Sequence, residues 1–157
     1  MTDPDYTFLD SQLRALLAGE HDALANAANF VALLYHALDD INWLGIYVLR
    51  DGELVLGPFQ GNTACVRISI GSGVCGAAAA TLETQRVADV HAFPGHIACD
   101  AASRSEIVVP LLIDDKLVGV LDIDSPSIDR FGAGDQAGIE GLCETYCRLH
   151  SGHERFI

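Results

Sequence analysis

The spacing of hydrophobic residues changes from a helical to a strand pattern near residue 40, and this change limits the folds open to the chain. Residues 5–39 predict two helices, because hydrophobic residues recur there every three or four positions. The predicted apolar faces are Leu9, Leu13 and Leu16 in the first helix, and Leu24, Ala27, Ala28, Val31, Leu34, Tyr35 and Leu38 in the second. From Trp43 onwards the pattern is typical of strands.

Two short turns indicate antiparallel hairpins. They are Asp51-Gly52 and Asp114-Asp115-Lys116, each between two hydrophobic runs. The predicted strands are residues 43–49, 53–60, 64–70, 84–90, 106–113 and 117–124. Further helices are expected over residues 74–82 and from about 134 to 150, and residues 91–104 form a long loop of the kind that often carries function.

This order of elements predicts an α+β fold. One central antiparallel sheet packs the N-terminal and C-terminal helices on one face, and the inserted helix and loops leave the other face free to form a pocket. With 157 residues, half of them hydrophobic, the chain is expected to form a single domain over residues 1–157 with a substantial core.

The composition argues against several classes of partner. The formal net charge is -13 at pH 7 and the nine basic residues are scattered, so neither nucleic acid nor an anionic membrane is an expected partner. The sequence contains neither a signal-peptide pattern at its N-terminus nor a hydrophobic stretch long enough to span a bilayer. We therefore expect a cytoplasmic protein, in which cysteines are more often reactive or metal-bound than permanently cross-linked.

Three of the five cysteines lie in loop-like segments beside glycine, histidine or acidic residues. These are Cys65, Cys75 and Cys99, whereas Cys143 and Cys147 share the hydrophobic stripe of the last predicted helix and are expected to be core residues. A reactive thiol needs exposure, a nearby dipole or cation, and a partner thiol. We predict a redox or nucleophilic role for the first three; the alternative is that they are ordinary loop cysteines.

Two motifs around these cysteines suggest other ligands. Gly71-x-Gly73-x-x-Gly76 matches the dinucleotide-binding fingerprint as a string, but the chain lacks the alternating strands and helices of that fold. A tight turn that places backbone N–H groups near Cys75 is therefore favoured. His91, His96 and Cys99, with Cys75 as a fourth ligand, could hold zinc, but their spacing fits no common structural zinc pattern, and we predict no bound metal.

Three acidic residues are predicted to lie close together. Asp122 and Asp124 are two residues apart on one strand and so point to the same face, and Glu106 lies on the preceding strand of the same hairpin. A single acid at a strand end is usually just solvated. Three together repel one another, so at least one should keep a proton near neutral pH, and the cluster could bind an ammonium group and supply a proton.

The aromatic residues of the first strand have two possible faces. Trp43 and Tyr47 alternate with Leu44, Ile46 and Val48. Core packing is the usual role of aromatics, but the aliphatic set is the better core face. This leaves Trp43 and Tyr47 as candidates for a pocket wall.

Together these segments resemble the free methionine-(R)-sulfoxide reductase family, a branch of the GAF-domain fold. The long loop motif, residues 89–100, is the most specific part, because most GAF domains lack the three cysteines. The matching stretches are NWLGIY (42–47), LGPFQG (56–61), ACVRI (64–68), GVCG (73–76), DVHAFPGHIACD (89–100), SRSEIVVP (103–110) and GVLDIDSP (119–126).

The resemblance implies thiol-dependent reduction of free L-methionine-(R)-sulfoxide, rather than of the protein-bound residue. Cys99 matches the attacking cysteine of the family, Cys65 the resolving cysteine that is bridged to it, and Cys75 a third cysteine that is an alternative resolver. Two sets of residues match the substrate-binding residues of the family. The acids are Glu106, Asp122 and Asp124, and the residues of the pocket wall are Trp43 and Tyr47. The resemblance also implies no bound cofactor, electrons from thioredoxin and NADPH, and a homodimer.

The alternative to an enzyme is a small-molecule sensor, which is the commoner use of GAF folds. A sensor would need an output domain or a signalling partner, and it would not need three pocket cysteines. The sequence does not distinguish Cys65 from Cys75 as the faster resolving thiol, or identify the acid that delivers the proton.

Overall fold

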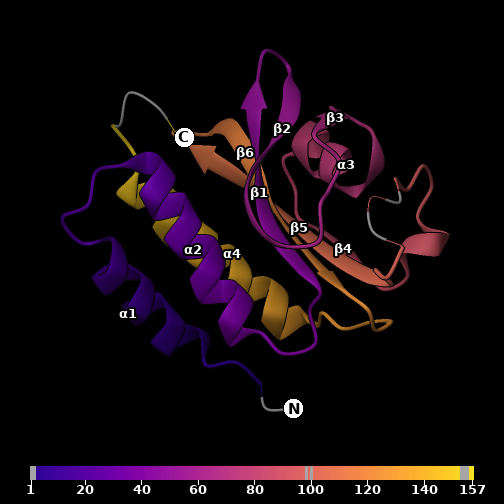
Figure 1. Ribbon diagram of the computed structural model, residues 1–157, viewed down its shortest axis with the longest axis horizontal. Helices are drawn as coiled ribbons and strands as arrows, with labels where there is room; N and C mark the ends of the chain where they lie inside the picture. The colour runs from indigo at the N-terminus through magenta and orange to yellow at the C-terminus, as the bar shows by residue number, and fades with distance from the viewer. Residues whose placement is uncertain (1–2, 98, 100, 153–155) are drawn as a thin grey trace.

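The computed structural model contains a six-stranded sheet with helices on both faces (Figure 1). It describes residues 3–97, 99, 101–152 and 156–157. The strand order is β3-β2-β1-β6-β5-β4, and every pairing is antiparallel. The strands are β1 (Trp43–Arg50), β2 (Glu53–Gly61), β3 (Arg67–Ser69), β4 (Gln85–Val87), β5 (Ser105–Ile113) and β6 (Lys116–Ser125).

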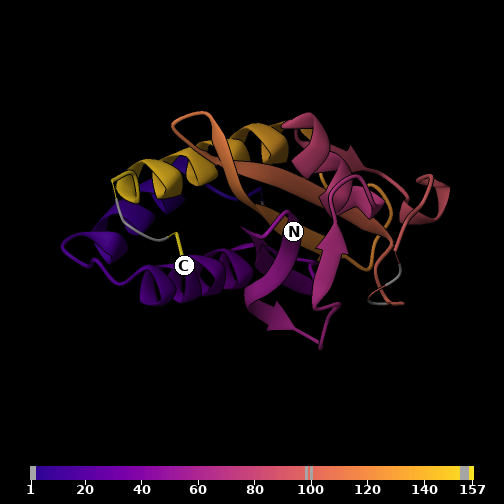
Figure 2. The ribbon, with the colours of Figure 1, turned by 90° about the horizontal axis from the view of Figure 1, so that it is seen from above.

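Two long helices lie against one face of the sheet, a third long helix packs on these two, and a short helix lies on the other face (Figures 1 and 2). The long helices are α1 (Tyr6–Leu17), α2 (Ala23–Ala37) and α4 (Ala133–Leu149). The short helix is α3 (Gly73–Thr81), and a 3-10 turn, η1 (Val90–Ala92), begins the long loop before β5. This arrangement confirms the predicted α+β fold. Among the described residues, the structure contains no helix with the length and hydrophobicity needed to cross a membrane.

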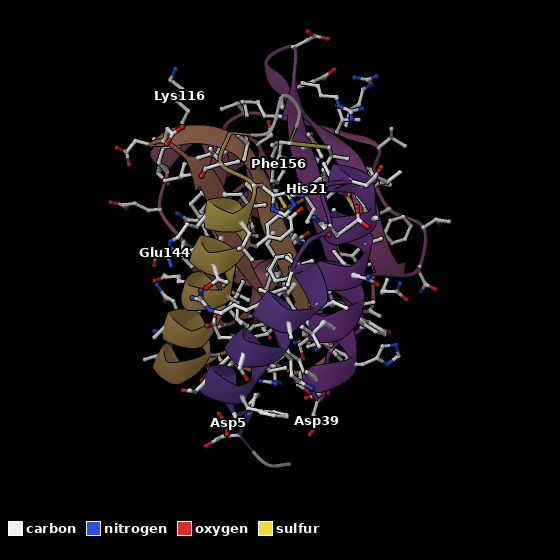
Figure 3. All side chains as sticks on the ribbon, turned by 90° about the vertical axis from the view of Figure 1, so that its left-hand side faces the viewer. Asp5, His21, Asp39, Lys116, Glu144 and Phe156 are labelled. Carbon is white, nitrogen blue, oxygen red and sulfur yellow. A yellow bond between two sulfur atoms is a disulfide. The ribbon has the colours of Figure 1, made fainter. Side chains whose placement is uncertain are left out.

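The two sides of the sheet hold separate hydrophobic clusters. Leu44, Ile46 and Val48 of β1 are buried with the long helices, whereas Trp43 and Tyr47 are buried with α3 on the other side. Figure 3, viewed from the helical side, shows the long helices packed together with Phe156 turned toward them. The alternation along β1 thus separates a structural face from the face that carries the cavity.

The N-termini of the first two helices are set by acidic caps. The Asp5 carboxylate accepts a hydrogen bond from the backbone N–H of Phe8, and Asp22 accepts one from Ala25. These bonds satisfy N–H groups that have no partner within the helix, and the negative charge also suits a helix N-terminus.

The buried faces of α1 and α2 differ in detail from the prediction. Leu16 is exposed and Leu17 is buried in its place. In α2, Leu24 and Ala28 are exposed, whereas Phe30 is fully buried and stacks on Tyr146 of α4 with ring centroids 4.4 Å apart. Packing of this ring pair fixes the rotation of α2, and the hydrophobic pattern of one helix alone does not reveal its partner.

The two edge strands are shorter than predicted. β3 covers residues 67–69 rather than 64–70, so Cys65 lies in a loop before it. β4 ends at Val87, because the chain then turns into η1, where the Asp89 carboxylate accepts a hydrogen bond from the N–H of His91. The shortened strands leave more chain in the loops around the cavity.

Candidate active site

A cavity lies on the face of the sheet opposite the long helices. Side chains of β1, β5 and β6, the first turn of α3 and residues of the loops before β3 and before β5 line it. The predicted pocket is therefore present, on the predicted face, with loops covering it.

A disulfide joins the two loops beside this cavity. Cys65 precedes β3 and Cys99 lies in the long loop before β5, and the bond between them brings their Cα atoms to 5.5 Å. Both residues are half-buried, and Cys99 lines the cavity. Two of the three predicted redox cysteines are thus in direct covalent contact.

Cys75 is more buried than the exposure predicted for a reactive thiol, although it lies in a helix close to the one predicted over residues 74–82. It is the third residue of α3 and only 4% exposed, with its Sγ atom 4.0 Å from Oε1 of Glu106. Burial, together with the nearby carboxylates of Asp122, Glu106 and Asp124, raises the pKa of the Cys75 thiol well above its usual range. Cys75 is therefore a protonated thiol inside the cavity wall.

The glycines around Cys75 explain this placement. Gly71 and Gly73 have φ values of +89° and +63°, a conformation that glycine adopts at little cost. The N–H of Gly71 donates to the carbonyl of Gly76, and a Cβ atom at Gly76 would lie 2.6 Å from the carbonyl oxygen of Ser69. The motif forms a tight turn that starts α3 against the sheet, and the all-antiparallel sheet excludes the dinucleotide-binding fold.

The three acidic residues lie side by side on the cavity floor. Glu106 of β5 is directly opposite Asp124 of β6, and Asp122 lies two residues before Asp124 on the same face. Their exposed fractions are 6%, 9% and 6% for Glu106, Asp124 and Asp122. The predicted hairpin therefore brings all three together, through the pairing of Glu106 with Asp124.

Burial governs the ionisation of this acidic cluster. It raises the pKa of Glu106 well above its usual range, and the charges of Asp122 and Asp124 raise it further. Burial also raises the pKa of Asp122, against hydrogen bonds from Glu106 and Cys75 that lower it. Since neighbouring buried carboxylates cannot all ionise easily, the cluster holds a proton to higher pH than separate, solvated carboxyl groups would.

Two aromatic residues of β1 form an adjoining wall. Trp43 and Tyr47 stack with ring centroids 5.9 Å apart, and both line the cavity. The Tyr47 hydroxyl donates a hydrogen bond of 2.9 Å to the carbonyl of Cys65, and the Trp43 indole N–H donates one of 3.0 Å to that of Asn62. The wall therefore also holds the loop that carries the disulfide.

The sequence interpretation missed the contact of Phe59 with Trp43 of this wall. Its ring stacks on Trp43 with centroids 5.4 Å apart, and the residue pairs with Gly45 across the hairpin. A Cβ atom at Gly45 would lie 2.5 Å from Cβ of Phe59 and 2.5 Å from the Trp43 ring. Counting the pairing back from the Asp51-Gly52 turn would place Gly45 opposite Pro58, and a register shift between Gly45 and Tyr47 moves the partner to Phe59, so the sequence alone does not reveal this contact.

The four metal ligands considered from the sequence are not assembled as a site. Cys99 is bonded to Cys65, and the rings of His91 and His96 are 6.5 Å apart. His96 does line the cavity, with Nε2 at 4.0 Å from Oε2 of Glu106, and burial lowers its pKa. In the described part of the chain, the His, Cys, Asp and Glu side chains close enough to share an ion are instead Cys75, Glu106 and Asp122.

Comparison with known proteins agrees with this fold and site. The GAF domain family model matches residues 27–146, so the chain is a GAF domain protein. It is 56% identical over 137 residues to the free methionine-R-sulfoxide reductase of Escherichia coli (strain K12), a match that covers 87% of this chain and 83% of that protein. The chain belongs to the free methionine-R-sulfoxide reductase family of oxidoreductases.

Solved structures of that family are also similar. The fRMsr of Staphylococcus aureus in complex with substrate is 50% identical, with a TM-score of 0.92, and the match covers 96% of this chain and 99% of that one. The free methionine-R-sulfoxide reductase from Neisseria meningitidis in complex with its substrate is 43% identical, with a TM-score of 0.89, and the match covers 92% and 87%.

Proposed function

We propose that this protein reduces free L-methionine-(R)-sulfoxide to L-methionine and is returned to its reduced state by thioredoxin. The observation that carries the proposal is the Cys65–Cys99 disulfide beside a cavity lined by three buried acids and two aromatic rings. The names of the Escherichia coli and Neisseria meningitidis relatives support the substrate.

The reaction starts at Cys99. Its thiolate attacks the sulfoxide sulfur, the substrate oxygen takes up protons and passes to the cysteine, and methionine leaves with Cys99 as a sulfenic acid. The Cys65 thiol then attacks the sulfenic sulfur, which forms the disulfide and releases one water molecule. Exchange with a dithiol carrier regenerates both thiols and oxidises the carrier to its disulfide, with the two electrons coming from NADPH.

The acidic cluster has two tasks in this scheme. Glu106, Asp122 and Asp124 bind the α-ammonium group of the substrate, and the proton that the cluster keeps is delivered to the sulfoxide oxygen. The raised pKa of Glu106 supports this second task, because a carboxyl group that holds its proton to higher pH can act as an acid.

The aromatic wall and the ammonium site together account for selection of a free amino acid. Trp43 and Tyr47 hold the methyl and thioether end, since sulfur packs favourably on aromatic rings. A peptide-bound methionine sulfoxide has no α-ammonium group and carries extra bulk at both ends. The buried acids would then lack their cationic partner, and such a substrate is excluded.

Cys65 is the resolving thiol of the proposal. For Cys75, an alternative resolving role follows from the family resemblance, but its burial and its raised thiol pKa make its thiolate less available. We therefore propose that Cys75 resolves the sulfenic acid more slowly than Cys65 does.

The remaining features follow from the family resemblance and the composition. The chain is expected to act as a single domain over residues 1–157, as a cytoplasmic homodimer, with no bound cofactor or resident metal. The net charge of -13 supports the expectation that it binds neither nucleic acid nor a membrane surface.

A single-turnover experiment tests the mechanism. Reduced protein, freed of reductant, is mixed with one equivalent of free L-methionine-(R)-sulfoxide, and methionine and the cysteine state are measured by mass spectrometry. We expect one methionine per chain and a Cys65–Cys99 disulfide in peptide maps. Methionine formed without that disulfide would refute the resolving step, and no methionine would refute the proposed reaction.

A further inference from the structure

Three donor groups in the cavity are close enough to share one metal ion. Cys75, Glu106 and Asp122 each offer a ligand atom, and these atoms lie within 4.8 Å of one another. Ligands of a tetrahedral zinc ion, at bond lengths of about 2.1–2.3 Å, lie about 3.5 Å apart. Side-chain movements of about 1 Å would therefore bring all three onto one ion. The remaining coordination position would face the cavity.

A second observation points to a cation at the same place. Asp122 is only 6% exposed and lines the cavity. Its carboxylate has hydrogen bonds from Glu106 and Cys75, but its Oδ1 atom is buried without a hydrogen-bond partner among the described residues. Such an atom is costly unless a donor or a cation reaches it. The unpartnered oxygen therefore marks a binding position for a positively charged ligand.

The charges around the cavity support the same conclusion. Glu106, Asp122 and Asp124 line it, and its described lining contains neither lysine nor arginine. The lining does include His96, whose pKa is lowered by burial and by His91, so its imidazole is neutral near pH 7. The acids thus face one another without a permanent positive charge, and a bound cation would relieve their repulsion.

The Cys75 thiol determines which kind of cation suits the site. Mg²⁺ and Ca²⁺ prefer six or more oxygen ligands, whereas a thiolate with two carboxylates and an open position suits Zn²⁺ or Cd²⁺. We propose that Cys75, Glu106 and Asp122 form a binding site for a thiophilic divalent cation such as Zn²⁺, and that the bound ion excludes the ammonium group of the substrate. Binding releases the thiol proton and the carboxyl proton to solvent. The exclusion rests on the proposed function, whereas the binding itself does not.

The oxidised protein provides a clean test of binding. Its Cys65–Cys99 disulfide removes two thiols, so only Cys75, Cys143 and Cys147 remain free. With Co²⁺ as the probe, we expect one ion per chain by equilibrium dialysis, a thiolate-to-cobalt absorption band, and displacement by Zn²⁺. No band, or no binding, in the wild-type protein would overturn the proposal.

Two variants and a control assign the ligands. Cys75→Ser should lose the band, whereas Cys143→Ser, which removes a thiol on the other side of the sheet, should keep it. Asp122→Asn should weaken Co²⁺ binding by at least about tenfold while retaining the wild-type circular dichroism spectrum. A band that survives Cys75→Ser, or that disappears with Cys143→Ser, would assign the metal to another site.

Competition tests the second part of the proposal separately. Free L-methionine-(R)-sulfoxide is added to the Co²⁺-loaded oxidised protein, which cannot turn over. We expect the apparent dissociation constant for Co²⁺ to rise in proportion to the sulfoxide concentration. An unchanged constant would overturn the exclusion and leave the metal site itself standing. Since no step of this test uses turnover, its failure is distinct from failure of the proposed reductase activity.

Discussion

The ionisable side chains of the cavity set one another's protonation states. Burial raises the pKa of Cys75, Glu106 and Asp122, and for Cys75 and Glu106 the neighbouring carboxylates raise it further. Cys99, by contrast, is half-buried in a loop and bonded to Cys65. The proposed attacking thiol and the proposed proton donors therefore occupy different environments within one cavity, which suits nucleophilic attack with proton transfer.

Cys99 is the proposed nucleophile, and its replacement should abolish the reaction. Cys99→Ser should lower turnover of free L-methionine-(R)-sulfoxide by at least about a thousandfold, because a serine hydroxyl cannot form the sulfenic acid or the disulfide. Cys143→Ser is the matched control, since Cys143 is buried among the helices on the opposite face, and it should keep most of the activity. Initial rates at saturating substrate measure both. A Cys99→Ser enzyme with substantial activity would contradict the assignment.

The raised pKa of Glu106 makes stability depend on pH. The unfolded chain loses this proton near the ordinary value of about 4.3, whereas the folded chain keeps it to higher pH. Ionisation of the unfolded state therefore lowers the free energy of unfolding as the pH rises through this interval. Glu106→Gln should remove this loss of stability, which is about 1.4 kcal/mol for each unit by which the pKa in the folded chain exceeds that in the unfolded chain. The variant should therefore be the more stable protein at pH 8.

Urea unfolding at pH 4 and pH 8 measures this prediction. The stability difference between Glu106→Gln and the wild type should be larger at pH 8 than at pH 4. Glu83→Gln, at an exposed position, is the control and should change little. The same stability difference at both pH values would show that the carboxyl group does not titrate as the structure implies.

At the scale of single elements, the position of α3 depends on the glycine turn before it. A Cβ atom at Gly76 would lie 2.6 Å from the carbonyl oxygen of Ser69 and 3.0 Å from the backbone of Gly71. Gly76→Ala should therefore displace α3, lower the stability by about 1–3 kcal/mol, and raise KM because the helix carries Cys75 into the cavity wall. Thermal unfolding and steady-state kinetics measure the two effects.

Gly141→Ala provides the matched control. Gly141 is also helical, but a Cβ atom there would meet nothing within 4 Å. The substitution should leave KM unchanged and stabilise the protein by up to about 1 kcal/mol, since alanine is the better helix former. Equal effects of the two substitutions would mean that the turn at Gly76 does not position α3.

Local patterns predicted the elements better than their contacts. Alternation along β1 and β6 correctly placed Leu44 in the helical core and Trp43 and Asp122 on the cavity face, because side-chain direction in a strand depends only on sequence parity. The burial of Phe30 and of Cys75 was missed, since each depends on an element distant in sequence. The partner of Cys99 came from the family resemblance and not from any local pattern.

At the scale of the whole molecule, the disulfide joins loops from the two halves of the sheet. Cys65 lies in the loop before β3 and Cys99 in the loop before β5, and the two cysteines are 34 residues apart in sequence. Closing a chain segment of this length restricts the unfolded state and is worth about 3–4 kcal/mol in the chain-entropy model. The oxidised protein should accordingly be the more stable form.

Denaturant unfolding of the two redox forms tests this consequence. The wild-type protein should lose stability on reduction, by an amount between about 2 and 4 kcal/mol. Cys65→Ser, which never forms the bond, should show no change with added reductant and should resemble the reduced wild type. Equal stability of the oxidised and reduced wild type would indicate that the disulfide is absent from the oxidised protein or that the native state is strained by it.

In the proposed reaction, the cavity selects one stereoisomer of one free amino acid. NADPH oxidation coupled through thioredoxin and its reductase measures this most directly, with free L-methionine-(R)-sulfoxide, the free S epimer and a peptide-bound sulfoxide compared side by side. We predict turnover with the free R epimer and none above background with the other two. Turnover of the peptide-bound sulfoxide, or no turnover of any of the three by reduced and folded protein, would contradict the account.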